Sequence, residues 1–402
     1  MTNKEKTELQ KEIVDSLDPK PHGRLLLAPR VGKTKIGIDV IKREKPDSVL
    51  WVTPSAELAE EDIPKEFETW KAKRFLNKLT TVTWMSLNKI TGHFGLIILD
   101  EEQFATENNL ETLLNGELTA DFIIAMTGTP TKHKEKIELY KKLGLDILYD
   151  MSINEAVDIG LLNNYSINVL EIALSTEKNI EAGSKDNRFM TSEQKNYEYL
   201  HKVAQQAIYQ KRRDTSFRIM ARRRAILDSP AKDNAAKWLF NHLEGRRKVI
   251  FASSIKQAEE VSNYTYHSKT DNVHLRRFKN GEVDELAMVN AGGTGHTYKA
   301  IDDLILVQAD SDKNGLTSQK ICRTLLKQKD YHATIWILCL VGTQDEKWVA
   351  STLESFDKTK IHHIRFINLI NQQDFANSGN DLDMFKKHGV KHIQIGSKNY
   401  KI

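Results

Sequence analysis

A glycine, a lysine and a hydroxyl residue stand together where an early apolar run of this chain ends. The run is residues 25–28, and the triplet is Gly32, Lys33 and Thr34. Where such a triplet joins a strand to a helix, backbone N–H groups and the lysine can hold phosphate oxygens, and the hydroxyl can bind Mg²⁺. We therefore predict that Arg30, Gly32, Lys33 and Thr34 bind the phosphates of a nucleoside triphosphate.

This loop departs from the complete phosphate-binding pattern at one position. The pattern has a glycine five residues before Gly32, where this chain has Leu27. A Gly-Lys-Thr triplet without further motifs is also compatible with an ordinary strand-to-helix turn. The residues further along the chain must therefore support the assignment.

An acidic block follows a second apolar run, residues 96–99. It consists of Asp100, Glu101, Glu102 and Gln103. A carboxylate at the carboxyl end of a parallel strand lies where α/β sheets bind ligands. We predict that Asp100 holds Mg²⁺, that Glu101 orients or deprotonates an attacking water, and that Gln103 contacts the nucleotide. The alternative is a charged helix N-terminus that complements the helix dipole.

Two further blocks could take part in the same chemistry. Residues 127–130, Thr-Gly-Thr-Pro, follow a third apolar run and form either a plain tight turn or a link between the nucleotide site and a neighbouring domain. Residues 211–224 hold seven lysines and arginines against Asp214 alone. That run, with Arg222, Arg223 and Arg224, is predicted to neutralise nucleic-acid phosphates, and the alternative is a solvated helix face.

The elements that must position these residues follow an alternating pattern. Continuously apolar strands separated by helical stretches indicate parallel sheets covered on both faces. In the first domain, residues 1–150, we expect strands at residues 25–28, 49–53, 81–84, 96–99 and 122–126. In the second domain, residues 151–350, we expect strands at residues 249–252, 286–290, 304–308 and 334–340, after a helical insert at about 178–245. Residues 351–402 form a C-terminal extension to which we assign no role.

Composition limits the class of protein. The 402 residues are enough for two to three domains, and 40% hydrophobic with 28% charged residues is typical of a globular protein. Cys322 and Cys339 are too few for a disulfide framework and lack metal-site spacing, which fits a reducing cytoplasm. The charged first twenty residues do not resemble a signal peptide, and no apolar run approaches the roughly 20 residues that span a bilayer. We expect a cytoplasmic protein without a membrane partner.

In this order, the blocks resemble those of the superfamily 2 helicases over roughly residues 24–345. These proteins carry a phosphate-binding loop, an Asp-Glu-x-His/Asp/Gln box and a Thr-Gly-Thr-Pro-like motif on the first of two RecA-like domains. Further matching blocks are residues 52–55, the segment around Thr83, residues 155–165, 248–254, 290–295 and 319–323. The resemblance implies an α/β fold of two tandem RecA-like domains that bind ATP and Mg²⁺.

The resemblance also implies roles for individual residues. The implied nucleic-acid contacts are Thr53, Pro54, Ser55, Thr83, Asn290 and Thr294. Gly295 would lie at the nucleotide, Gln319 would be catalytic, and Arg323 would be the arginine that stabilises charge on the γ-phosphate. The sixth motif departs from its usual form, because Cys322 replaces a glycine and Leu326 replaces the last arginine. These departures are compatible with a weak or strictly DNA-stimulated ATPase, and also with a damaged one.

The implied function is an ATP-dependent DNA helicase or translocase that acts on single-stranded, forked or branched DNA as a monomer. The length, the spelling of the first loop and the Gln-containing box are most similar to phage-encoded helicases of branched DNA, which would work in replication, recombination and repair in the host cytoplasm. An RNA-directed helicase of the same superfamily is one alternative. A nucleotide-gated nucleic-acid clamp that does not unwind is the other.

Overall fold

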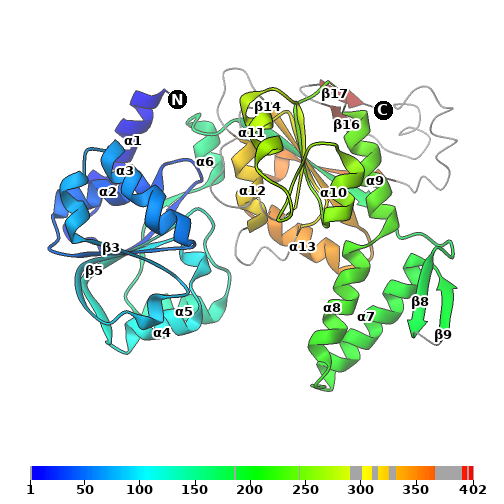
Figure 1. Cartoon of the computed structure of the whole chain (residues 1–402), viewed down its shortest axis with the longest axis horizontal. Coiled ribbons are helices and arrows are strands. Elements are labelled where there is room, and N and C mark those ends of the chain that lie inside the picture. Colours follow the sequence, from blue (N-terminus) through cyan, green and yellow to red (C-terminus); the bar gives the residue numbers. More distant parts are fainter. Residues whose placement is uncertain are drawn as a thin grey trace. The chain divides into compact units, whose positions relative to one another are not determined.

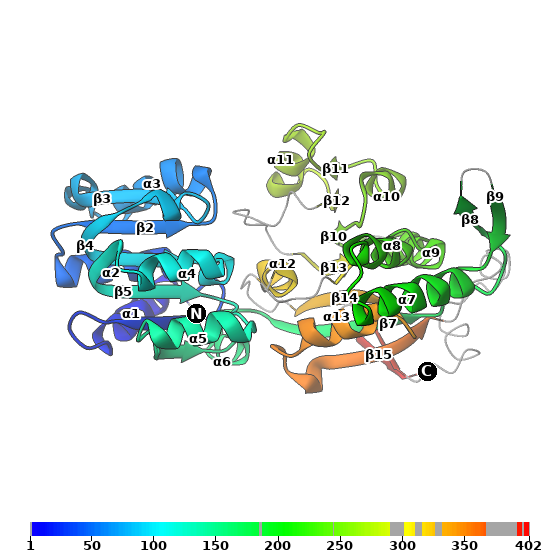
Figure 2. The ribbon, with the colours of Figure 1, turned by 90° about the horizontal axis from the view of Figure 1, so that it is seen from below.

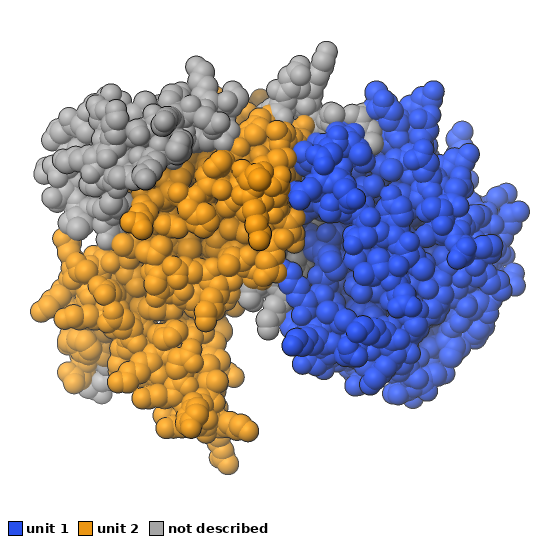
Figure 3. Space-filling view, turned by 180° about the vertical axis from the view of Figure 1, so that it is seen from behind, with its two compact units in different colours: residues 1–162, 313–322 blue, residues 163–312, 323–402 orange. Residues whose placement is uncertain are grey.

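The computed structural model describes residues 2–184, 187–243, 245–289, 301–309, 316–325, 332–366, 392–395 and 398–401. The chain divides into two compact units, which Figure 3 colours separately. The first consists of residues 1–162 and 313–322, and the second of residues 163–312 and 323–402. No helix of the described ranges is long and apolar enough to cross a membrane.

A six-stranded parallel sheet forms the centre of the first unit, with the strand order β3-β2-β4-β5-β1-β6. Its strands are β1 (Gly23–Leu27), β2 (Val49–Thr53), β3 (Leu79–Thr83), β4 (Gly92–Asp100), β5 (Leu118–Thr127) and β6 (Ile147–Met151). The α-helices are α1 (Asn3–Asp15), α2 (Lys33–Glu44), α3 (Ile63–Thr69), α4 (Glu107–Leu114), α5 (Lys134–Lys142) and α6 (Ile153–Asp158). Short segments of π- or 3₁₀-helix lie at Leu58–Asp62, Lys73–Lys78, Leu87–Lys89 and Glu102–Phe104.

Alternate residues of these strands pack against helices on opposite faces of the sheet. Trp51, Ile98 and Met126 face α2, where they lie around Gly37. The intervening residues of β2 and β4 join a buried cluster with Leu110 and Leu113 of α4. Figure 1 shows the same arrangement, with α1, α2 and α3 on one side of the sheet and α4 and α5 on the other. Burial on both faces explains why the strands read as continuous apolar runs.

The second unit contains a seven-stranded parallel sheet with the order β11-β12-β10-β13-β14-β7-β15. Its strands are β7 (Asn164–Ile172), β10 (Lys248–Phe251), β11 (Thr265–Tyr266), β12 (Glu285–Met288), β13 (Asp303–Leu306), β14 (His332–Leu340) and β15 (Ile361–Phe366). The helices with it are α9 (Pro230–His242), α10 (Ile255–Val261), α11 (Val273–Asn280), α12 (Leu316–Thr324) and α13 (Gln344–Leu353), with a 3₁₀ turn at Lys358–Lys360. A separate antiparallel pair is β16 (His392–Ile395) with β17 (Lys398–Lys401).

The segment between β7 and α9 contains two hairpins. Strands β8 (Ile180–Ser184) and β9 (Asn187–Thr191) pair only with each other, and helices α7 (Glu193–Tyr209) and α8 (Thr215–Leu227) form an antiparallel pair. Both hairpins extend beyond the sheet of the second unit in Figure 1, and β8 and β9 also do so in Figure 2. We expected only helices at 178–245, so the strands β8 and β9 correct that expectation. Their described side chains are largely exposed, and a strand without a buried face has no hydrophobic pattern to detect.

The boundaries of the units also differ from the expected ones. The first unit continues past residue 150 to Leu162, because edge strand β6 pairs with β1 and brings α6 with it. Most residues of β6 are exposed or half-buried, so its sequence carries a weak strand signal. Residues 313–322, expected in the second domain, group with the first unit. The boundary therefore falls within α12.

A buried ion pair joins the acidic block to β1, a strand inside the sheet between β5 and β6. Arg24 donates from Nε to Glu102 Oε2 at 2.9 Å, and the two residues are only 7% and 0% exposed. Burial raises the pKa of Glu102, and the Arg24 guanidinium opposes that shift. Tyr140 donates from its hydroxyl to the Glu102 carbonyl oxygen at 3.0 Å. These contacts fix the backbone just after Glu101.

We expect Arg24→Met to lower the free energy of unfolding by about 3–5 kcal/mol, because it leaves the Glu102 carboxylate buried and unpaired. Urea denaturation measures the loss. The double variant Arg24→Met with Glu102→Leu serves as the matched control, since it removes both charges and should recover most of the stability. Equal losses in the single and double variants would show that the unpaired Glu102 carboxylate is not the cause of the lost stability.

Candidate functional site

The predicted phosphate loop lies at the carboxyl end of β1, a strand inside the sheet. The loop turns twice through left-handed backbone conformations, with φ of 74° at Arg30 and 96° at Gly32, before α2 begins at Lys33. A Cβ atom on Gly32 would collide with the side-chain amide of Gln10. Gly32 is therefore required both for its φ angle and for this close approach. Lys33 and Thr34 occupy the first turn of α2, where N–H groups lack partners within the helix.

Gln10 of α1 is a site residue that the sequence analysis missed. It is 3% exposed, and its Nε2 donates to the Val31 carbonyl oxygen at 2.7 Å. This bond ties the first helix to the phosphate loop. A signal was present, because Gln10 is a polar residue at helical spacing from the buried Ile13 and Val14.

Asp100 ends β4 and is almost entirely buried, with 9% exposure. Burial, and next the neighbouring Glu101 carboxylate, raise the pKa of Asp100 to about 7. The Lys33 ammonium acts in the opposite direction. Near neutral pH both the protonated and the ionised form of this carboxyl are therefore populated. A bound cation would favour the ionised form.

Lys33 and Glu101 form an ion pair at this edge of the sheet. Lys33 Nζ lies 2.7 Å from Glu101 Oε1, and the two side chains are 15% and 22% exposed. Glu101 itself has a left-handed backbone with φ of 51°. The structure thus brings together two predicted catalytic residues that are 68 positions apart in the chain.

The acidic block and the Thr-Gly-Thr-Pro turn share one hydrogen-bond network. Gln103 Nε2 donates to Glu101 Oε2 at 2.8 Å, and the Thr127 hydroxyl donates to Gln103 Oε1 at 2.6 Å. The Thr129 N–H donates to the Thr127 hydroxyl at 2.9 Å. Gln103 is 0% exposed. Its amide thus positions Glu101, and the contact between Gln103 and the nucleotide stays a prediction.

The same turn packs against the phosphate loop. A Cβ atom on Gly128 would lie 3.1 Å from the Leu27 carbonyl oxygen and 3.3 Å from Pro29 Cγ. Only a residue without a side chain allows this approach at no cost. The Thr-Gly-Thr-Pro segment is therefore part of the site and is more than a plain turn.

Gln319 of α12 reaches the same carboxylate. Its Nε2 donates to Glu101 Oε2 at 3.1 Å, and residues 313–322 belong to the first unit. Arg323 follows one helical turn later on the α12 backbone, but its side chain lies outside the described residues. The predicted residues Asn290, Thr294 and Gly295, together with Leu326, also lie outside them.

The predicted nucleic-acid residues of the first unit end two neighbouring strands. Thr53 of β2 and Thr83 of β3 are register partners. The Thr83 hydroxyl lies 3.1 Å from that of Ser86, whereas the Thr53 hydroxyl is buried without a hydrogen-bond partner among the described residues. Pro54 and Ser55 follow and are partly exposed. Met85, which the sequence analysis passed over, is 91% exposed beside this edge.

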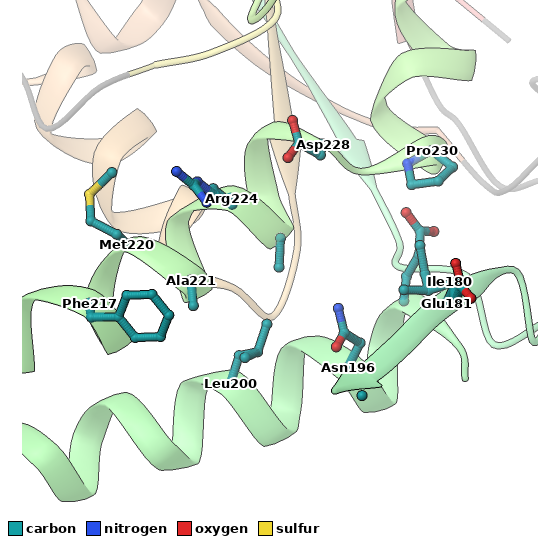
Figure 4. Close-up of a pocket in the computed structure, with 13 residues that line it drawn as sticks. Ile180, Glu181, Asn196, Leu200, Phe217, Met220, Ala221, Arg224, Asp228 and Pro230 are labelled. Carbon is teal, nitrogen blue, oxygen red and sulfur yellow. The ribbon is translucent and has the colours of Figure 1, made fainter. Parts of the chain in front are cut away.

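The three consecutive arginines of α8 do not form one surface patch. Arg222 is 7% exposed and Arg223 is half-buried, and only Arg224 is exposed. Arg224 lines a cavity of about 590 Å³ together with Glu181 and Asp228, as Figure 4 shows. Successive residues of a helix point about 100° apart, so a run of three cannot share a face. The prediction of a phosphate-binding triplet is corrected for Arg222.

The oxygen donors at this edge fit Mg²⁺. The described residues contain no group of three or more His, Cys, Asp and Glu side chains that could hold a metal. Mg²⁺ is commonly held by one or two carboxylates together with substrate phosphates and water. The buried Asp100 carboxylate and the Thr34 hydroxyl in the first turn of α2 supply donors of that kind.

Comparison with known proteins gives a likeness to solved structures only. No family model matches the chain, and no curated protein matches it. The DNA-bound ATP-dependent Type ISP restriction-modification enzyme LlaBIII is similar over 95% of this chain and 32% of its own, with a TM-score of 0.56 and 13% identity. Dbp5 of S. cerevisiae, bound to RNA and ADP BeF3, is similar over 94% of this chain and 93% of its own, with a TM-score of 0.53 and 11% identity.

These matches agree with the two parallel sheets described above. The chain spans about a third of the LlaBIII chain, and nearly the whole of Dbp5. At such low identity the likeness concerns the fold. The chain therefore has a fold of two tandem RecA-like α/β domains, as the sequence predicted, and its insert contains a β-hairpin in addition to the predicted helices.

Proposed function

We propose that this protein is a nucleic-acid-stimulated ATPase of the helicase kind, which couples ATP hydrolysis to movement on, or remodelling of, forked or branched DNA. The observation that carries the proposal is the site at the carboxyl edge of the first sheet. There the loop lysine, the buried Asp100 and the Glu101 carboxylate converge, with Gln103 and Thr127 bonded behind them. This is the set of charges that phosphoryl transfer to water requires.

We propose that the Lys33 ammonium changes its partner from the Glu101 carboxylate to the phosphates of ATP when the nucleotide binds. In the structure its ammonium is paired with Glu101. When ATP phosphates bind at the loop, the ammonium would contact them instead, and Glu101 would be released to accept a proton from the attacking water. Water then adds to the γ-phosphorus, and ADP leaves with the electron pair of the broken P–O bond. Gln103 and Gln319 keep the carboxylate oriented through Oε2.

Thr34 and Asp100 would hold Mg²⁺, which supplies positive charge against the phosphate oxygens. Arg30 and Gly32 complete the proposed phosphate site, with Gly295 beside the nucleotide. Arg323 is the proposed arginine for transition-state charge. The proposed backbone contacts to nucleic acid are Thr53, Pro54, Ser55, Thr83, Asn290 and Thr294.

The choice of DNA rests on the sequence resemblance, which favours phage-encoded enzymes of replication, recombination and repair that act as monomers in the host cytoplasm. The similar solved structures include one bound to DNA and one bound to RNA, so an RNA-directed helicase is the second candidate. The retained Lys33, Asp100 and Glu101 favour an active ATPase over a clamp that never hydrolyses.

Steady-state ATP hydrolysis in the presence of single-stranded, duplex and forked DNA and of single-stranded RNA tests the proposal. We expect the highest rate with forked DNA, and strand separation in the same mixture. Stimulation by RNA alone would replace the DNA assignment with the RNA one. A protein that binds nucleotide and DNA but shows no turnover with any nucleic acid would be the clamp.

A further inference from the structure

We propose that the outer face of α7 and the tip of the α7–α8 hairpin bind unpaired bases of a nucleic-acid strand, with Tyr199 and Tyr209 stacking on the bases and nearby Lys and Arg side chains holding the phosphates. The proposal deepens the function proposed above and rests on it. It adds a base-stacking surface on α7 to the insert, for which the sequence predicted only phosphate contacts by the basic run of residues 211–224.

The outer face of α7 carries a regular stripe of exposed side chains. Its inner face is buried through Tyr197, Ala204 and Ala207. On the opposite face, exposed residues recur at intervals of three and four, which places them in one line along the helix. The members of this stripe are Lys195, Tyr199, Lys202, Gln206 and Tyr209.

Two large rings in that stripe face solvent. Tyr199 is 63% exposed and Tyr209 is 88% exposed. A tyrosine ring usually buries much of its apolar surface, so two open rings on one helix face are available for a partner. Bases of single-stranded nucleic acids stack on aromatic side chains of proteins, because every unpaired base has an accessible face.

The charge of the hairpin favours a phosphate partner over an apolar protein surface. Residues 193–227 contain nine Lys and Arg against three Asp and Glu, a net charge of +6, whereas the whole chain carries only +4. At the tip, Asp214 accepts from both Arg212 and Arg218 at 3.0 Å. Lys211 and Arg213 are exposed, and no described residue forms an ion pair with either of them. Their charges are available to a strand.

The tip is held in a defined turn. The Arg212 N–H donates to the Ala207 carbonyl oxygen at 3.0 Å, and the Thr215 hydroxyl donates to the same oxygen at 3.0 Å. At the other end of the hairpin, Tyr197 and Ile226 join the core cluster of the second unit. Figure 1 shows the tip projecting from that unit. A surface ordered in advance loses less conformational entropy when it binds.

Tyr199→Ala with Tyr209→Ala tests the stacking. Fluorescence anisotropy of the full chain should show binding to labelled single-stranded DNA weakened at least about fivefold, and binding to blunt duplex changed much less. The matched variant Tyr199→Phe with Tyr209→Phe keeps both rings and should retain the affinity. Unchanged single-strand binding by the alanine variant, or an equal loss on duplex, overturns the stacking role.

Lys211→Ala with Arg213→Ala tests the phosphate contacts. The slope of log affinity against log salt for single-stranded DNA should become shallower by about 1.4, the effect of two lost phosphate contacts. Lys141→Ala with Lys256→Ala removes two exposed lysines elsewhere and should leave the slope unchanged. An unchanged slope in the tip variant overturns the phosphate role.

The wild-type ATPase separates the two proposals. If wild-type hydrolysis is stimulated by nucleic acid while the tyrosine variant binds single strands normally, only the inference about the insert fails. If nucleic acid neither binds nor stimulates the wild-type protein, the proposed function fails as well. The midpoint of thermal unfolding is measured for each variant. A midpoint equal to that of the wild-type protein shows that these exposed substitutions preserve the fold.

Discussion

We expect Lys33→Ala to lower the proposed nucleic-acid-stimulated ATP hydrolysis by at least about 10²-fold, the size of effect found when one preorganised donor to developing charge is lost. The Lys33 ammonium supplies the positive charge of the phosphate loop, and its Nζ lies 2.7 Å from Glu101 Oε1. Its removal deletes a phosphate contact and leaves Glu101 without this ion pair. It also removes the positive charge that opposes the raised pKa of Asp100, so that carboxyl becomes harder to ionise. Steady-state phosphate release measures the loss.

Lys42→Ala is the matched control for this variant. Lys42 lies in the last turn of the same helix, α2, and pairs with Asp39 at 3.3 Å. An exposed or half-exposed pair of this kind contributes little to stability, so turnover should remain near the wild-type value. Undiminished turnover in Lys33→Ala would sink the assignment of the phosphate loop.

We expect Glu101→Gln to lower turnover by about 10²- to 10⁴-fold, the range for loss of a general acid–base group, and to leave ATP binding intact. The change keeps the size of the side chain and most of its hydrogen-bonding capacity toward Gln103 and Gln319. It removes the negative charge that could accept a proton. Single-turnover hydrolysis, together with binding of a fluorescent nucleotide, separates the chemical step from affinity.

Glu107→Gln provides the comparison for Glu101→Gln. Glu107 is an exposed residue in the first turn of α4, close in sequence and outside the network at Glu101. Its loss should leave turnover within a fewfold of wild type. If both variants behave alike, Glu101 is not the group that activates water, and another base must be sought.

Most of the first sheet could be predicted from the sequence because its strands are covered on both faces. Residues 49–53 of β2 and residues 96–99 of β4 are all buried, so each of these segments reads as an unbroken apolar run. The edge strand β6 and the hairpin β8–β9 escaped prediction for the opposite reason. Their side chains are mostly exposed, and a strand with no buried face leaves no hydrophobic period in the sequence.

The candidate site was predictable only as a set of residue types at strand ends. The residues Lys33, Thr34, Asp100 and Glu101 follow directly from their positions after apolar runs. The roles of Gln103 and Gln10 could not be read in this way, because they depend on which atoms the fold brings within hydrogen-bonding distance. For the arginines of α8, helical periodicity decided that Arg222 is buried while Arg224 is exposed.

The sequence by itself determined that two parallel α/β domains carry a phosphate loop, an acidic block and a Thr-Gly-Thr-Pro turn, because strand burial and special turn residues are local properties. Only the tertiary structure decided that Glu101 meets Lys33, that Gln103 links Glu101 to Thr127, and that two tyrosines of α7 face solvent. Those facts depend on contacts between segments far apart in the chain, or on which face of a helix the core covers.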